Sequence, residues 1–269
     1  MRFYDTHTHL DYPAFAGDLG PVIARAQAAG IARIITLGTD LAGSARCLKI
    51  AEQYPNVYAG AGWHPTHVFQ NPPEDLRPAL REFAQHPKVV AIGETGLDHY
   101  RRPEGCASEA EFKDYKERQA RYFRQHLEVA LEFGLPCVIH QRDSFAAILE
   151  ELAPFAGKVR GVFHCFSESV EGLGSVLDLG LMVSYTGILT FPKGQNVRDD
   201  LAATPMDRFM LETDSPFLVP AACRGKQKRC EPAFLRETAL MAAEIKKCSL
   251  EELSAVTCRT AEKLFSKMA

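Results

Sequence analysis

Two histidines near the start of the chain, His7 and His9, are separated by one residue at the end of the first strand-like segment. Residues i and i+2 of a strand project to the same face, so both imidazoles could bind one cation. By chance, a His-x-His pair is more often an ordinary surface or core pair than a metal site. The pair therefore predicts a metal site only if further ligands reach the same place.

Other side chains that can bind a metal follow apolar runs later in the chain. They are Glu94 after 89–93, His140 after 137–139, His164 after 161–163 and Asp214 after 210–213. With the first two histidines they make four imidazoles and two carboxylates, which is more than one four-coordinate ion needs and indicates two divalent cations with a carboxylate between them. The alternative is that each side chain caps a strand end by bonding to backbone, which suits any one of them but explains the whole set poorly.

Eight Val-, Ile- and Leu-rich runs alternate with amphipathic or charged stretches, the pattern of parallel strands covered by helices. The runs begin near Arg2, Ile31, Val57, Lys88, Pro136, Val159, Leu181 and Arg208. From residue 2 to residue 208 the seven intervals average about 29 residues, close to the unit length of a (β/α)8 barrel of about 250 residues. We therefore predict an α/β fold, a single-domain TIM barrel over residues 1–269, in preference to a shorter doubly wound sheet.

The carboxyl ends of all strands in such a barrel open on one face, where active sites are built. We expect the six candidate ligands to converge on that face. The longest interval predicts one amphipathic helix over 108–133, stopped by Gly134 and Pro136. Its apolar residues are Phe112, Tyr115, Tyr122, Phe123, Leu127, Ala130 and Leu131. An irregular segment, 216–232, follows the eighth strand.

The composition is that of an ordinary globular protein. Hydrophobic residues make up 46% and charged residues 24% of the 269, which excludes a disordered, collagen-like or coiled-coil chain. The net charge of −3 excludes a global basic field, so a polyanionic partner must be held locally. The polar start and the lack of a long apolar window predict a cytoplasmic protein without a membrane partner. Eight cysteines without a C-x-x-C pair are expected to be reduced thiols.

Six short motifs occur in order along the chain: DTHTHLD (5–11), GWHP (62–65), GETGLDHY (93–100), IHQRD (139–143), HCFS (164–167) and LETDSP (211–216). Together they resemble the TatD-like metal-dependent deoxyribonucleases, TIM-barrel hydrolases of the wider amidohydrolase-like group. The resemblance covers nearly the whole chain. It implies that His7, His9 and Asp214 bind one ion and that His140 and His164 bind the other. It further implies that Glu94 bridges the two ions, which would be Mg, Mn or Zn.

The resemblance also implies hydrolysis of phosphodiester bonds, as a 3′-5′ exonuclease on single-stranded or frayed DNA. Glu94 and Asp214 are then the catalytic carboxylates, with Asp214 orienting or deprotonating the attacking water. His64 and Arg142 could bond a phosphate, although either could be a structural rim residue. A basic run, 224–229, with Arg224 and Lys226, should lie on the metal face and cradle the substrate backbone, although such a run is usually a solvated loop.

Several neighbours of these residues are expected to act indirectly. Glu212 and Asp5, each two residues before a ligand, should point into the barrel and contact a partner such as a ligand histidine. Asp98 should fix a loop or support a ligand. Trp63 and Tyr100 could stack on bases, although strand-end aromatic residues are more often packing.

Two positions depart from the family pattern. Thr66 stands where relatives commonly have a second histidine, with His67 one residue later, and Cys230 precedes Glu231-Pro232 where relatives often carry Asn.

Two other functions stay open. One is hydrolysis of an ester or amide, because a fold does not fix its substrate, and the other is metal binding without catalysis. Strand four ends in Glu94 rather than in the lysine that bridges metals in relatives acting on cyclic amides or phosphotriesters, which argues against such substrates. We expect a monomer or weak oligomer.

Overall fold

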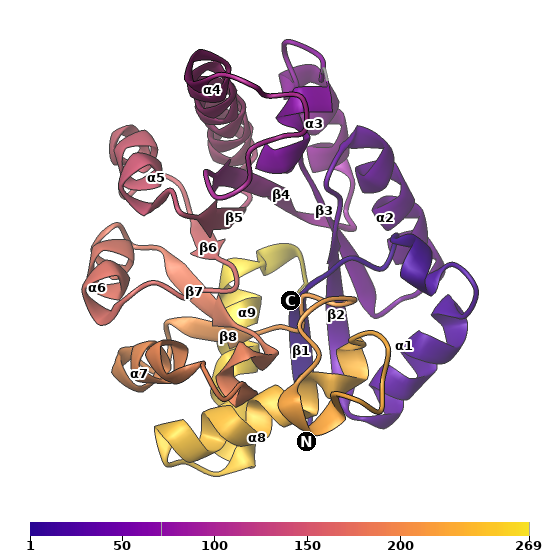
Figure 1. Cartoon of the computed structure of the whole chain (residues 1–269). Coiled ribbons are helices and arrows are strands. Elements are labelled where there is room, and N and C mark those ends of the chain that lie inside the picture. Colours follow the sequence, from indigo (N-terminus) through magenta and orange to yellow (C-terminus); the bar gives the residue numbers. More distant parts are fainter. Residues whose placement is uncertain (71, 269) are drawn as a thin grey trace.

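Eight parallel strands form one sheet whose order in space is their order in the sequence. The computed structural model describes residues 1–70 and 72–268, and Figure 1 shows the strands as a central ring inside a layer of helices. The strands are β1 (Phe3–Thr8), β2 (Ile31–Leu37), β3 (Val57–Ala61), β4 (Val89–Asp98), β5 (Cys137–Arg142), β6 (Gly161–Phe163), β7 (Met182–Tyr185) and β8 (Phe209–Leu211). Each begins within two residues of its predicted start, so the predicted (β/α)8 barrel is confirmed.

The helices follow the strands in alternation. They are α1 (Leu19–Ala28), α2 (Leu41–Gln53), α3 (Arg77–Gln85), α4 (Glu109–Phe133), α5 (Phe145–Leu152), α6 (Val170–Asp178), α7 (Gln195–Ala203), α8 (Leu235–Lys246) and α9 (Leu250–Leu264). In the described residues, none of them is long and apolar enough to cross a membrane.

The barrel closes between its first and last strands through the chain just beyond them. Thr8 forms an isolated parallel bridge with Ser215. The backbone N–H of His9 donates to the carbonyl of Ser215 over 2.8 Å, and that of Asp214 donates to the carbonyl of His7 over 2.9 Å. Closure thus places Asp214 beside the two histidines of β1.

Two strands run further than the sequence predicts. Glu94 and His140 were expected just after β4 and β5, but both lie inside these strands. The pairing register shifts between Ile92 and Thr95, after which the last residues of β4 pair with the last residues of β5, up to Asp98 opposite Arg142. The shift turns Glu94 inward without ending the strand, because a bulge re-aims a side chain locally.

Helix α4 matches the predicted span. Ser108 caps its first turn in a reciprocal bond with Glu111, and Gly134 ends it in the left-handed conformation at φ 62°. Both features are standard helix boundaries, because they satisfy backbone groups that lack a partner inside the helix.

The hydrophobic core has two parts. The larger lies between strands and outer helices, and the smaller fills the barrel interior with one or two side chains from most of the strands. The interior cluster continues into α9, whose Cys258, Ala261 and Leu264 pack beneath it with Phe265. The end of the barrel where the strands begin is therefore plugged, which leaves the opposite end for a site.

Candidate active site

A cavity of about 390 Å³ opens where the strands end. The predicted site residues that line it are His9, His64, Glu94, His140, Arg142, His164 and Asp214. His7 lies directly behind, with its Nε2 3.3 Å from the Nε2 of His9. The structure thus brings all six candidate ligands together.

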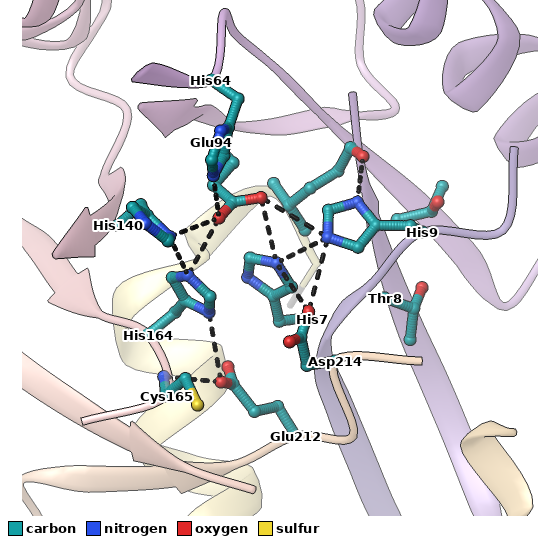
Figure 2. A network of polar contacts seen from close by, with 12 residues as sticks. His7, Thr8, His9, His64, Glu94, His140, His164, Cys165, Glu212 and Asp214 are labelled. Atoms are coloured by element: carbon teal, nitrogen blue, oxygen red, sulfur yellow. Dashed lines mark hydrogen bonds and ion pairs between the residues drawn. The ribbon is translucent and has the colours of Figure 1, made fainter. Parts of the chain in front are cut away.

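Glu94 lies at the centre of the cluster, between two groups of side chains (Figure 2). Its carboxylate is buried, and each oxygen faces a different group. Oε2 lies 3.5 Å from His7 Nε2 and 3.4 Å from His9 Nε2. Oε1 lies 3.1 Å from His140 Nδ1 and 2.9 Å from His164 Nε2. One carboxylate therefore reaches two separate sets of nitrogen donors.

The first set has the spacing of a metal cage. Asp214 Oδ1 lies 3.7 Å from His7 Nε2 and 3.4 Å from His9 Nε2, so the set has four donor atoms, two from the end of β1, one from the segment after β8 and one from Glu94 in β4. Ligands at 2.0–2.1 Å from a tetrahedral ion stand about 3.3–3.4 Å from one another. The observed spacings of 3.3 to 3.7 Å fit that geometry.

The second set is as compact. His140 Nδ1 lies 3.2 Å from His164 Nε2, and His64 Nε2 lies 3.3 Å from the same Glu94 oxygen that these two face. Nitrogen and carboxylate oxygen donors at such distances suit a second divalent ion. A third, overlapping set of His7, His164 and Glu212 also has donor atoms within 4.8 Å of one another.

Carboxylates behind the cluster orient two of its imidazoles. Asp98 Oδ2 lies 3.2 Å from His140 Nε2, and its Oδ1 accepts from the backbone N–H groups of Tyr100 and Arg101 at 3.1 Å, so it supports a ligand and fixes the loop as well. Glu212 Oε1 lies 3.5 Å from His164 Nδ1. Such outer contacts fix the orientation of a metal-binding imidazole.

The remaining contacts of Glu212 come from Cys165 N–H at 2.7 Å and the Ser184 hydroxyl at 2.6 Å. Asp5, by contrast, accepts from the backbone N–H and hydroxyl of Thr213, at 2.9 and 2.6 Å, and weakly from the backbone N–H of His7. Asp5 is therefore buried with a partner, as expected, but the partner is Thr213 and not a ligand histidine. Asp5 ties β1 to the chain after β8.

Both central carboxylates are held ionised. Burial alone would raise the pKa of Glu94, but the charge of the neighbouring His164 imidazole and the hydrogen bond from His140 hold it well below its usual range. Burial also opposes the ionisation of Asp214, yet the hydrogen bond with His9 and the nearby His7 lower its pKa. Two anionic carboxylates among imidazoles form a donor set suited to divalent cations.

Not all of the predicted substrate-binding residues line the cavity. Arg142 lines it, with its guanidinium 3.8 Å from the ring centre of the exposed Tyr100. Arg224 lies over the ring of Phe191 instead, and Lys226 is exposed, and neither lines the cavity. Their contact with substrate stays a prediction.

The two departures from the family pattern are accounted for locally. The Thr66 hydroxyl lies 2.7 Å from His64 Nδ1, and the His67 ring bonds the carbonyl of Thr39 at 3.0 Å, so both line the cavity. Cys230 is buried, and its backbone N–H donates to Pro216. The backbone, rather than the thiol, anchors that loop.

Five cavity residues were missed in the sequence. Tyr12, Phe217 and Leu218 line one side, Arg101 lines the other, and Thr39 lines the cavity as well. All but Thr39 lie one to three residues beyond a motif residue, Asp11, Pro216 or Asp98, so nearness to a strand-end motif was the only available signal.

Known proteins resemble this chain over its full length. The family model described as TatD related DNase matches residues 4–266. The uncharacterized metal-dependent hydrolase YabD of Bacillus subtilis is 36% identical over 265 residues, which are 97% of this chain and 98% of that protein. The 3'-5' ssDNA/RNA exonuclease TatD of Erwinia tasmaniensis is 34% identical over 268 residues, 98% and 99% of the two. The crystal structure of YJJV, a TatD homolog from Escherichia coli K12, has a TM-score of 0.87 at 28% identity and covers 98% of each chain.

Proposed function

Because this chain belongs to the TatD family of metal-dependent hydrolases, we propose that it is an exonuclease that removes nucleotides from the 3′ ends of single-stranded DNA. The reaction is hydrolysis of the terminal phosphodiester bond. The proposal rests on the family and on the arrangement of donors around Glu94.

The single observation that carries the proposal is that the two carboxylate oxygens of Glu94 face two different sets of donor atoms. Its Oε2 faces His7 and His9, and its Oε1 faces His140 and His164. We assign one divalent ion to the first set with Asp214, and a second ion to the other set, with Glu94 shared. Mg, Mn and Zn all remain candidates, since imidazoles favour Zn and phosphodiester chemistry often runs on Mg.

Two divalent ions, when bound, would polarise a phosphoryl oxygen and supply a water nucleophile at neutral pH. The chain contributes the proton acceptor. Asp214 lies at the cavity wall, and its pKa is lowered, so its carboxylate is ionised and can orient the attacking water and take its proton. The leaving deoxyribose oxygen would be protonated from solvent, to which the cavity is open.

His64 and Arg142 were both expected to bond a phosphate, and we assign them different roles. Burial lowers the pKa of His64 to about 4, so its imidazole is neutral. Its Nδ1 accepts from the backbone N–H of Thr66 at 3.2 Å, which leaves the proton on Nε2, directed at Glu94. We therefore assign His64 to the positioning of Glu94. Arg142, whose guanidinium forms no salt bridge in residues 1–70 and 72–268, is assigned to the phosphate.

The cavity size favours a strand end over an internal segment. At about 390 Å³ it lies near the small end of ligand pockets, which span about 300–1,000 Å³. Its floor is closed by the buried ligands and the barrel interior beneath them. Such a blind cavity accepts a terminal nucleotide more readily than the middle of a strand.

The test is degradation of end-labelled single-stranded DNA by metal-stripped protein, refilled in parallel with Mg, Mn and Zn. We expect metal-dependent shortening from the 3′ end. Glu94→Gln should lower kcat by at least about 10²-fold, because the carboxylate shared by both donor sets is lost. It should also bind fewer ions, measured by elemental analysis after gel filtration.

Glu262→Gln is the matched control. It makes the same chemical change in a half-buried glutamate that bonds Tyr4 at the far end of the barrel, and it should keep full activity and metal content. Shortening from the 5′ end would refute the polarity. Binding of about two ions without cleavage of any nucleic acid would refute the substrate and direct attention to esters and amides.

A further inference from the structure

The cavity has two chemically different walls. On one side, Tyr12, Phe217 and Leu218 come from the segments after β1 and β8. On the other, Arg101 and Arg142 come from the ends of β4 and β5. Strands β1 and β8 are neighbours at the closure of the eight-stranded ring, and β4 and β5 lie across it (Figure 1). The walls therefore face each other over the Glu94 cluster.

The first wall is aromatic and partly open to water. The Tyr12 ring stacks on His9 with centroids 4.9 Å apart at 28°, and Phe217 meets the edge of Tyr12 at 5.7 Å and 86°. Phe217 remains 47% exposed in spite of these contacts. A large aromatic side chain left uncovered at the rim of a polar cavity offers a flat face to a ligand.

The turn that carries Phe217 is held firmly. Its backbone N–H donates to the carbonyl of Asp214 at 2.9 Å, and the carbonyl of Pro216 accepts from Cys230 at 2.9 Å. The carbonyl of Leu218, the residue after Phe217, lies so close to Gly187 that a Cβ on Gly187 would be 2.7 Å from it. The wall is thus in place before any ligand arrives, which limits the ordering cost of binding.

The opposite wall carries unpaired cations. Arg101 is exposed, and Arg142 lies over Tyr100. Neither forms a salt bridge with any residue in the described part of the chain, although many other arginines of this protein do. Free guanidinium groups beside a cavity suit phosphate oxygens.

We propose that Phe217, Tyr12 and Leu218 form a binding site for the nucleobase of the terminal nucleotide. This rests on the proposed function. A nucleotide has a flat uncharged base and an anionic phosphate, and the two walls match these parts in chemistry. The base stacks on Phe217 while the phosphates of the chain run towards Arg101 and Arg142. Because every base has a π face, the site accepts all four bases.

Binding of mononucleotides tests the site without any cleavage. Titration calorimetry on the full chain with Mn²⁺ would compare dAMP with 2-deoxyribose 5-phosphate, which lacks the base. We expect dAMP to bind roughly tenfold more tightly or better. Phe217→Ala should abolish that difference, and Phe217→Tyr should keep it. Equal binding of the two compounds by the unmodified protein would overturn the proposal.

Cleavage adds a second readout. Two oligonucleotides identical except for a 3′-terminal adenine or abasic residue should differ roughly tenfold or more in kcat/KM. Phe217→Ala should bring the ratio near one by slowing only the base-bearing strand. Phe69→Ala is the matched control, since Phe69 is 38% exposed and does not line the cavity, and it should keep the original ratio.

The two ideas fail differently. Equal cleavage of both strands would overturn the base site and leave the exonuclease standing. If neither strand is cut with any ion, the proposed function fails, and the binding of dAMP still decides whether the aromatic wall recognises a base.

Discussion

The protonation state of a buried carboxylate in this protein depends on the side chains next to it. Glu94 is ionised because imidazoles surround it. Asp200 on α7 has no such partners: it is 1% exposed, and neither carboxylate oxygen has a hydrogen-bond partner within the described residues. Burial, and then the nearby Asp199 and Glu168 charges, raise the pKa of Asp200 to about 6. Glu94 is thus ionised for use in the site, whereas ionisation of Asp200 destabilises the fold.

The raised pKa predicts a pH dependence of stability. Between pH 3.8 and about 6 the folded protein holds a proton on Asp200 that the unfolded chain has released. Stability from this residue therefore falls as the pH rises through that window and stays low above it. Asp200→Asn should increase the free energy of unfolding by about 1–3 kcal/mol near pH 8, and the gain should shrink towards pH 4.

Urea unfolding at several pH values would measure this effect. Asp199→Asn, next along the same helix, removes only one of the charges that raise the pKa of Asp200 and leaves Asp200 buried, so it should show a smaller gain than Asp200→Asn. A gain for Asp200→Asn that does not change between acid and alkaline pH would contradict the argument.

Site residues could be predicted from the sequence where they follow a strand-like apolar run. His7, His9, His140, His164 and Asp214 follow recognisable apolar runs, and so they were found together with Glu94. Asp98 was expected to fix a loop or support a ligand, but that the ligand is His140 was not predicted, because this contact depends on the register shift in β4, which is a property of backbone pairing. Tyr12, Phe217 and Arg101 were missed because residues in loops carry no periodic signal.

At the scale of elements, helix α4 does more than cover the barrel. Its predicted apolar face included Leu131, which is 44% exposed, whereas the polar Gln119, Gln125 and His126 are buried. Each bonds the backbone of a loop. His126 Nε2 accepts from Trp63 N–H at 2.9 Å, next to His64. Hydrophobic periodicity cannot reveal such residues, because their burial is decided by loops distant in sequence.

Two glutamines of α4 each bond one backbone N–H and one backbone C=O, at different places. Gln119 accepts from Asp98 N–H at 2.9 Å and donates to Asp98 C=O at 3.0 Å, at the last residue of β4. Gln125 accepts from Leu76 N–H at 2.8 Å and donates to Glu74 C=O at 3.0 Å, in the loop before α3. Of the two places, only the end of β4 contacts the site, since Asp98 lies against His140.

The pair predicts separable effects on stability and catalysis. Gln119→Met and Gln125→Met should each lower the free energy of unfolding by about 1–3 kcal/mol, because buried backbone groups lose their partners. Gln119→Met alone should also lower kcat per folded molecule, by about tenfold, as expected when the outer support of a metal ligand is lost. Urea unfolding and single-strand degradation at saturating metal would measure both. Equal activity of the two variants would show that α4 acts on stability only.

At the scale of the whole molecule, the barrel end where the strands begin is filled by core side chains, and the end where the strands finish carries the candidate site. Strand spacing was enough to predict this architecture, because eight strand-like runs at an average interval of about 29 residues match the repeating unit of a (β/α)8 barrel. The plug formed by α9 was not predicted: Phe265 and Leu264 complete the barrel interior from the last helix. With that end filled, loops on the other end can vary without loss of the core.

The molecule carries a net charge of −3, so attraction to the proposed DNA substrate requires a local group of positive charges. Within the basic run 224–229 the structure separates two exposed lysines from two arginines whose side chains have a partner. Arg229 is paired with Asp18 at 2.5 Å and Glu231 at 3.0 Å, and Arg224 lies over Phe191. Lys226 and Lys228 are exposed and form no salt bridge in the described residues.

These two lysines predict how substrate binding depends on salt. Each phosphate contact contributes about 0.7 to the slope of log affinity against log salt for single strands, so Lys226→Ala with Lys228→Ala should reduce the slope by up to about 1.4. KM for single-stranded DNA at several salt concentrations would measure it. Lys49→Ala with Lys263→Ala removes the same two charges from exposed positions on α2 and α9, away from the loop face, and takes the net charge equally from −3 to −5. If both pairs flatten the slope alike, the attraction is a property of total charge; if only the first does, it belongs to the loop after β8.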